Sequence, residues 1–209
     1  MTPIQHFESV WERCNELSGL HDYLSGRLTA ALRPDELLRA EWVARVSALD
    51  LYVHELVAQR MTAIFEGRIA APPGNGKFQI SAEVLMRIRA APTPIAASAA
   101  FDLEVRTRLG IQTYQDPEKI ADGIRLVSDK ELWNEVALQC GAAQATKAAE
   151  AKKKKRQLSL IVERRNKIAH EGDLQPGLPR IPWPISRADL QEVEQAIHQI
   201  VQGIHAVVV

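Results

Sequence analysis

The sequence contains few of the residues that mark disulfide-rich, metal-binding or membrane-spanning proteins. Only two of its 209 residues are cysteines, and Cys14 and Cys140 stand far apart without metal-ligand spacing around them. This distribution argues against a disulfide framework and against a zinc site. No apolar run approaches the length that crosses a bilayer, and the N-terminus lacks the basic-then-apolar pattern of a signal peptide. We therefore expect a soluble, cytoplasmic protein that does not associate with membranes.

The chain also carries no net charge, because 26 lysines and arginines balance 26 aspartates and glutamates. The chain as a whole therefore does not attract nucleic acid or anionic membranes, and any basic surface must be local. Hydrophobic residues make up 46% and charged residues 25%, which are ordinary values for a globular protein. We expect residues 1–209 to form a single domain.

Two further patterns are missing. No segment alternates apolar and polar residues as a half-buried strand does, and residues 72–77 (PPGNGK) lack the spacing and the preceding strand of a nucleotide-binding loop. Helical periodicity dominates instead, which predicts an all-α bundle with extra short helices, interrupted by loops at 67–80 and 172–185. The expected helices cover residues 3–24, 35–65, 82–91, 95–109, short stretches within 110–143 broken near 116–117 and 128–129, then 145–170, and finally the segment from 186 onward.

Capping residues mark where some of these helices begin. Ser81, with nearby Glu83, is a suitable cap for the short helix that follows it, and Ser186 with Asp189 opens the last helix. The apolar face of that last helix is expected to use Leu190, Val193, Ile197, Ile200, Val201 and Ile204.

The residues best suited to chemistry gather at the end of the predicted 145–170 helix, where residues 164–173 read RRNKIAHEGD. On helical geometry Asn166 and His170 lie one turn apart, whereas Arg165 and His170 are offset by about 140°. Arg165 and His170 can converge if the arginine side chain bends round, if the helix loosens near its end, or if a second copy of the chain supplies the missing groups. The last option predicts a site shared across a dimer interface.

A plainer interpretation of the same segment is a polar helix end. Lys167 and protonated His170 would then offset the negative end of the helix dipole, which is a common arrangement. On spacing alone this interpretation is favoured.

A run of basic residues precedes the cluster in the same predicted helix. In a chain of zero net charge it is the strongest local positive field and suits an RNA backbone. Taken alone, such a run is usually a solvated helix surface, but its position roughly two to four turns before the motif that runs from Arg165 to His170 favours a role in RNA binding. The predicted RNA-binding residues are Lys152, Lys153, Lys154, Lys155, Arg156, Arg164 and Lys167.

The predicted helix before Phe65 carries a second polar feature. Asp50 falls on its apolar stripe, and together with Ser47 and His54 it forms a polar seam on the face that should meet the core. Because burying an unpaired carboxylate is costly, we expect Asp50 to have a partner, an Arg or His of the 145–170 helix. A buried contact that fixes helix register and a catalytic support role are equally good interpretations, whereas His54 alone fits a core or rim histidine.

The chain offers acid–base and cationic groups, but no spacing typical of a metal site and no recognisable setting for a nucleophilic Ser or Cys. Cleavage of RNA by its own 2′-hydroxyl needs a group for proton transfer and a cation for the phosphorane charge. We therefore expect neither a metal nor another cofactor.

Residues 165–170 resemble the Arg-(polar)-x-x-x-His motif of the HEPN superfamily (higher eukaryotes and prokaryotes nucleotide-binding domains). Residues 49–57, residues 114–120 and then Trp133 resemble the RiboL-PSP-HEPN branch. Together these segments, in the expected order, span roughly residues 40–172.

The resemblance implies a helical bundle that dimerises with its two motif helices face to face. Many members are metal-independent endoribonucleases of toxin–antitoxin, phage-defence and RNA-processing systems. By carry-over, Arg165 would position and neutralise the scissile phosphate and His170 would transfer protons. Asn166 would orient the substrate or the histidine, and Asp50 would support the motif.

The leading hypothesis is thus an endoribonuclease acting as a homodimer, a toxin or phage-defence effector with an antitoxin or defence-system partner. Some members of the superfamily have lost catalysis, and the retention of both Arg165 and His170 favours an active enzyme. The alternative is a non-catalytic module that binds RNA, a nucleotide or a partner protein. A third possibility is a scaffold in which the polar seam only sets the register of a dimer.

Overall fold

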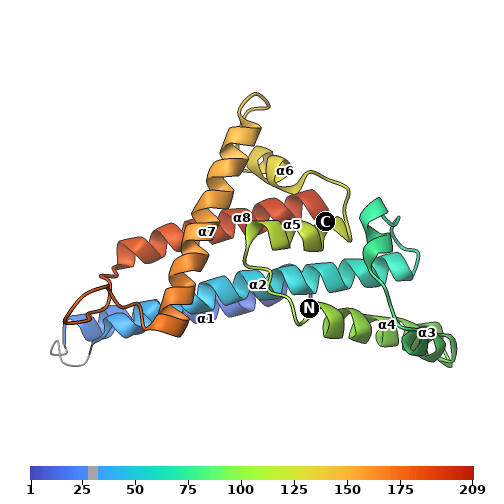
Figure 1. Ribbon diagram of the computed structural model, residues 1–209, viewed down its shortest axis with the longest axis horizontal. Helices are drawn as coiled ribbons and strands as arrows, with labels where there is room; N and C mark the ends of the chain where they lie inside the picture. The colour runs from blue at the N-terminus through green and yellow to red at the C-terminus, as the bar shows by residue number, and fades with distance from the viewer. Residues whose placement is uncertain (28–32) are drawn as a thin grey trace.

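A computed structural model describes residues 1–27 and 33–209, and over these ranges the chain is helical with no β-sheet, as the sequence predicts (Figure 1). Most predicted helices are confirmed to within two residues of their expected ends. The loop predicted after the second long helix contains one short 3₁₀ helix. The elements are α1 (Pro3–Ser25), α2 (Asp35–Phe65), η2 (Pro73–Lys77), α3 (Ala82–Arg89), α4 (Pro94–Leu109), α5 (Pro117–Arg125), α6 (Leu132–Gln139), α7 (Lys147–Glu171) and α8 (Arg187–Val208).

Local hydrogen bonds explain where the helices begin. Ser81 accepts from the backbone N–H of Val84 at the start of α3, and Ser186 and Asp189 form a reciprocal capping box at the start of α8. Asp116 caps α5 with Pro117 at the first helical position, where a missing N–H costs nothing. The predicted starts at Ser81 and Ser186 are therefore confirmed, and the predicted break near 116–117 is the start of α5.

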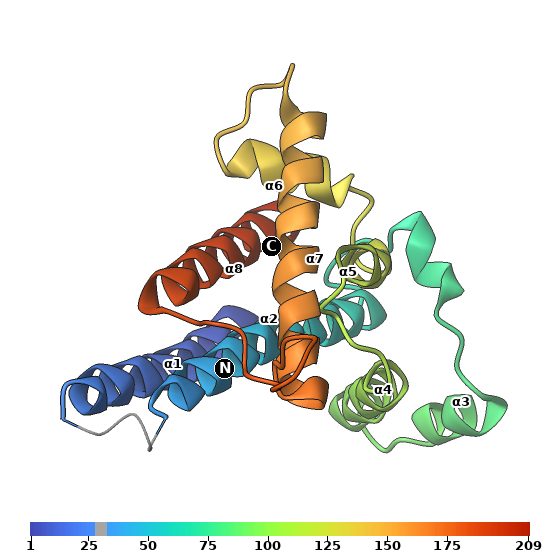
Figure 2. The same ribbon diagram turned by 60° about the vertical axis from the view of Figure 1, so that its left-hand side comes forward.

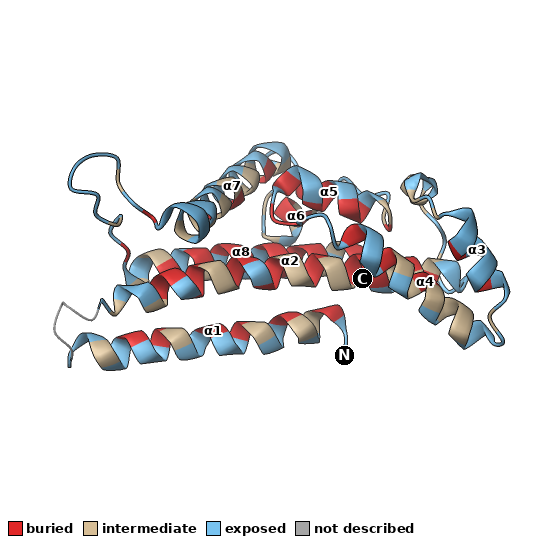
Figure 3. Ribbon diagram, turned by 60° about the horizontal axis from the view of Figure 1, so that its bottom comes forward, coloured by how far each residue is buried: buried red, intermediate tan, exposed pale blue. Residues whose placement is uncertain are grey.

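The helix α2 is the centre of the fold. The helix α1 lies along one side of it, α8 lies along another, and α7 crosses it steeply (Figures 1 and 2). Buried residues concentrate on α2 and on the neighbouring face of α8, whereas the outer faces of α1 and α7 are exposed (Figure 3). All six residues predicted for the apolar face of α8 are buried, which confirms that face.

The crossing of α2 and α7 positions the candidate site, because α7 carries the cluster of residues 164–173. The indole nitrogen of Trp42, which is buried, donates to the backbone oxygen of Ile161 over 2.9 Å. A satisfied polar contact of this kind inside an apolar interface fixes one orientation of the two helices more tightly than apolar packing does.

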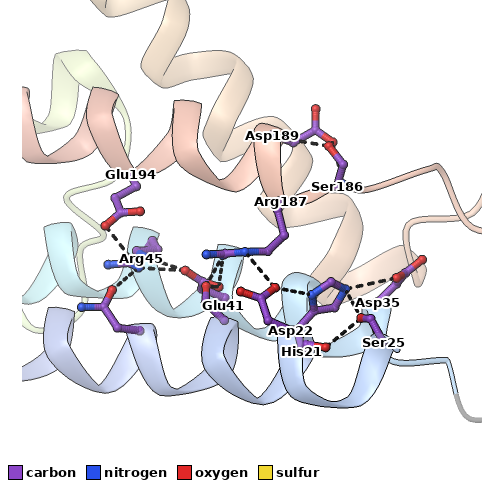
Figure 4. Close-up of polar contacts among 12 residues, drawn as sticks. His21, Asp22, Ser25, Asp35, Glu41, Arg45, Ser186, Arg187, Asp189 and Glu194 are labelled. Atoms are coloured by element: carbon purple, nitrogen blue, oxygen red, sulfur yellow. Dashed lines mark hydrogen bonds and ion pairs between the residues drawn. The ribbon is translucent and has the colours of Figure 1, made fainter. Parts of the chain in front are cut away.

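A buried ionic network that was not predicted from the sequence joins α1, α2 and α8 (Figure 4). Glu41 and Arg45 are both fully buried, and Arg45 Nη2 donates to Glu41 Oε1 over 2.8 Å. Ser18 of α1 and Arg187 of α8 also contact the Glu41 carboxylate. The guanidinium of Arg45 also lies 4.1 Å from the centre of the Trp11 ring. The two buried charges of α2 therefore compensate each other, and groups of α1 and α8 add further contacts to them.

We predict that Glu41→Gln destabilises the fold by roughly 3–5 kcal/mol, because it leaves the buried Arg45 with only the partly exposed Glu194, 3.6 Å away, as a counter-charge. Equilibrium unfolding in denaturant measures the loss. The matched control is Asp122→Asn, which breaks an exposed pair with Arg125 and should cost less than about 1 kcal/mol. Equal losses in the two variants would mean that the buried network contributes no more than a surface pair.

Candidate functional site

The helix α7 ends abruptly just after the predicted motif. It remains α-helical through Glu171 and stops at Gly172, which adopts the left-handed conformation (φ 67°) that glycine takes without strain. The backbone N–H of Asp173 then donates to the Lys167 oxygen over 3.0 Å. Since the helix does not loosen before His170, one of the three routes by which Arg165 and His170 could converge is excluded.

Two of the three motif side chains, Arg165 and Asn166, are hydrogen-bonded to each other. Arg165 Nη1 donates to Asn166 Oδ1 over 2.9 Å, so the arginine side chain bends toward its neighbour. The Asn166 and His170 side chains are exposed, whereas Arg165 is half-buried. Within residues 1–27 and 33–209, no hydrogen bond to the His170 ring is present. A single copy therefore presents an accessible amide–guanidinium pair and an imidazole that nothing orients.

A buried carboxylate anchors the end of α7. Asp173 is only 1% exposed and accepts hydrogen bonds from Arg39 Nε (3.1 Å) and from Arg164 Nη2 (3.2 Å). Arg164 also donates to the Pro184 oxygen over 2.7 Å and lies over the Trp42 ring. Because its contacts lie within the fold, we assign the predicted RNA-binding residue Arg164 a structural role.

The structural role of Asp173 is not among the sequence predictions, although one signal in the sequence points to it. An acidic residue directly after a helix-ending glycine lies near the negative end of the helix dipole, where a carboxylate is unfavourable unless cations compensate it. Arg39 of α2 and Arg164 of α7 supply this compensation.

The segment predicted as a loop at 172–185 is an ordered hairpin-like turn that folds back beside the end of α7 (Figure 2). Backbone hydrogen bonds run from Gln175 N to Ile181 O (2.8 Å) and from Trp183 N to Asp173 O (2.7 Å). Between this hairpin and the last turn of α7 is an open pocket of about 680 Å³. Its lining comprises Lys167, His170, Glu171, Leu174, Gln175, Pro176, Arg180 and Trp183.

The basic run on α7 is partly neutralised. Lys153 pairs with Glu150 (2.6 Å), Lys155 pairs with Glu118 (2.9 Å), and Lys154 donates to Gln199. Lys152 and Arg156 are exposed and form no ion pair with any described residue. These two cations lie within about 40° of His170 around the helix axis, so they share its face.

The expected partner of Asp50 is corrected by the structure. Asp50 accepts hydrogen bonds from the backbone N–H of Tyr114 and from Gln115 Nε2, and His54 Nε2 lies 3.7 Å from it. The expectation of an Arg or His from α7 is therefore wrong. Asp50 faces the turn before α5, whose backbone donor and amide satisfy the carboxylate.

The polar seam on α2 also differs from the prediction. The Ser47 side chain is exposed and donates to the Val43 oxygen, so it does not face the core. The His54 ring lies 4.6 Å from the Tyr114 ring and is partly exposed, as expected for a rim histidine. Burial, with help from the Asp50 carboxylate, raises the pKa of Tyr114 to about 12.

Segments 49–57 and 114–120 thus meet through Asp50, but neither is bonded to the motif at the end of α7. Within the described ranges no group of three or more His, Cys, Asp or Glu side chains is arranged to hold a metal ion. No described helix combines the length and the apolar character that a membrane span requires. Comparison of the chain with protein-family models, with curated proteins and with solved structures found no match.

We predict that Asp173→Ala loosens the hairpin and the last turn of α7, because two arginines lose their shared counter-charge. The expected cost is roughly 2–5 kcal/mol in free energy of unfolding, together with faster hydrogen exchange at the amides of Gln175 and Trp183. The matched control is Asp129→Ala, which changes an exposed loop carboxylate. It should leave the free energy of unfolding and the two exchange rates unchanged. Unaltered exchange in Asp173→Ala would show that the hairpin does not depend on this carboxylate.

Proposed function

We propose that this chain is a metal-independent endoribonuclease of the HEPN type, which acts as a homodimer. The observation that carries the proposal is the accessible group of Arg165, Asn166 and His170 at a rigidly terminated helix end. The sequence resemblance to the HEPN superfamily supports the same assignment.

The proposed reaction needs only proton transfer and charge stabilisation. A base removes the proton of the ribose 2′-hydroxyl, whose oxygen attacks the adjacent phosphorus. The bond to the 5′-oxygen breaks, and that oxygen takes up a proton. The products are a 2′,3′-cyclic phosphate and a 5′-hydroxyl. His170 is the proton-transfer group and Arg165 stabilises the charge of the phosphorane.

Asn166 has a positioning role in this proposal. Its Oδ1 accepts from Arg165 Nη1, which holds the guanidinium on the exposed side of α7. Its amide nitrogen has no partner among the described residues, so it is free to donate to an oxygen of the substrate. Arg165 is itself half-buried, which restricts its side chain further.

The second copy follows from the geometry of α7. The helix is regular through Glu171, and Arg165 and His170 are separated by about 140° around its axis. In a twofold dimer with facing α7 helices, Arg165 of one copy can approach His170 of the other, since such an interface pairs the same patch with itself. Lys152 and Arg156, which share the face of His170, would extend the cleft and attract the RNA backbone.

A non-catalytic RNA-binding module is the second candidate. The His170 ring lacks an orienting partner within the described chain, whereas Lys152 and Arg156 are accessible, which suits binding without cleavage. This candidate predicts salt-sensitive affinity that falls when these two cations are neutralised. The proposed biological setting, a toxin or phage-defence effector with an antitoxin or defence partner, rests on the sequence resemblance and would apply to either candidate.

We predict that the purified protein cleaves RNA in the presence of EDTA. Arg165→Ala and His170→Ala should each lower the rate by about 10²–10⁴-fold, because each removes a group that acts on the reacting atoms. Arg89→Ala and His198→Ala change exposed residues of the same types elsewhere and should leave the rate unchanged. Activity that requires an added metal, or that survives both motif substitutions, would contradict the mechanism.

A mixing experiment tests the shared site. Arg165→Ala and His170→Ala chains are unfolded together and refolded, so that about half of the dimers contain one of each. If Arg165 and His170 act across the interface, each mixed dimer has one intact site, and the mixture recovers roughly a quarter of the wild-type activity. No recovery, although mixed dimers form by native mass spectrometry, would place both groups of a working site on one copy.

A further inference from the structure

Trp183 combines an exposed side chain with a fixed backbone. The chain has four tryptophans, and Trp11, Trp42 and Trp133 are at most 8% exposed, whereas Trp183 is 42% exposed. The backbone N–H of Trp183 donates to the backbone oxygen of Asp173 over 2.7 Å, and the backbone oxygen of Trp183 accepts from Arg39 Nη2. Two buried charged residues thus fix the backbone of Trp183, while its indole stays exposed and available to a ligand.

This indole lines the 680 Å³ pocket together with His170, which is the candidate proton-transfer group. The volume lies within the range of small-ligand sites and accommodates one nucleotide. Lys167 and Arg180 supply two cations on the pocket wall, which suit a phosphate.

Beside these cationic donors, two side chains of the pocket offer acceptors to a base, Gln175 and Glu171. Gln175 Nε2 donates to the Pro182 oxygen over 3.1 Å, so the side-chain amide retains its oxygen for an incoming group. Glu171, also on the wall, adds a carboxylate. A base with an exocyclic amino group has donors for these acceptors, whereas uracil offers a single ring N–H.

We propose that this pocket binds one nucleotide of single-stranded RNA beside the scissile phosphate and selects its base. The base stacks on Trp183, the phosphate next to it lies against Lys167 and Arg180, and Gln175 and Glu171 favour amino-bearing bases. The identification of the ligand as RNA rests on the proposed function, because His170 would connect this pocket to the reacting phosphate. Stacking on the indole contributes affinity for every base. The preference for amino-bearing bases therefore comes from the acceptors of Gln175 and Glu171.

The test measures binding without cleavage. Short 2′-O-methyl oligoadenylate, oligocytidylate and oligouridylate cannot be cut by 2′-hydroxyl attack, and Trp183, as the exposed tryptophan, reports binding through quenching of its fluorescence. We expect Trp183→Leu to weaken the affinity for oligoadenylate roughly 5- to 150-fold, measured with a labelled oligonucleotide, and Trp183→Phe to retain most of it. Tyr23→Leu, an exposed aromatic on α1, is the matched control and should bind as the wild type does.

A second variant keeps the test valid if Trp183→Leu does not fold. Arg180→Gln lies on the exposed tip of the hairpin, and we expect it to reduce the salt dependence of binding by about one unit of the log–log slope. Arg89→Gln, an exposed arginine on α3, should leave that slope unchanged. Oligouridylate should bind more weakly than oligoadenylate or oligocytidylate.

The outcomes separate this proposal from the nuclease itself. Equal oligonucleotide affinity in wild type and folded Trp183→Leu overturns the subsite, even if the protein cleaves RNA. A change in dimer stability with unchanged oligonucleotide affinity also overturns it, because Trp183 is then a contact between copies. Trp183-dependent binding by a protein that cleaves nothing establishes the subsite and contradicts the proposed catalysis instead.

Discussion

The pairing of one buried carboxylate, Asp173, with Arg39 and Arg164 determines how the end of α7 joins the rest of the molecule. A carboxylate removed from water must be compensated, so the start of α2 and the last turns of α7 have to come together around it. The same two arginines hold the return arm of the hairpin, because Arg39 also donates to the Trp183 backbone oxygen and Arg164 to the Pro184 backbone oxygen. Helix end, hairpin and pocket are therefore consequences of a single electrostatic requirement.

A second set of buried charges acts at the other face of α2. Glu41 and Arg45 draw in polar groups from α1 and α8, and apolar stripes alone would allow these helices to slide by a turn. With Trp42 bonded to Ile161 of α7, α2 carries three specific polar contacts over its first third. The central helix therefore fixes the angle at which α7 presents its exposed face.

Helix positions were predictable from the sequence, because caps such as Ser81 and Ser186 act on atoms three residues away. The polar cluster of residues 164–173 was also visible, since its residues are adjacent in the chain. The partners of Asp50 were not, because they come from a turn 64 residues later in the sequence. Arg164 was predicted to bind RNA because an arginine suits a phosphate. Only the tertiary fold reveals that its guanidinium is already bonded to the Asp173 carboxylate.

The hairpin after α7 has two parts with different constraints. Main-chain hydrogen bonds hold its two arms at residues 173–175 and 181–183, whereas residues 176–180 form the connecting tip. Pro176 and Arg180 of the pocket wall belong to this tip. Exposed tips accept substitution and insertion more readily than helices do. One wall of the pocket can therefore diversify in evolution while α7 and its motif stay unchanged, so that related proteins could acquire different ligand preferences on the same framework.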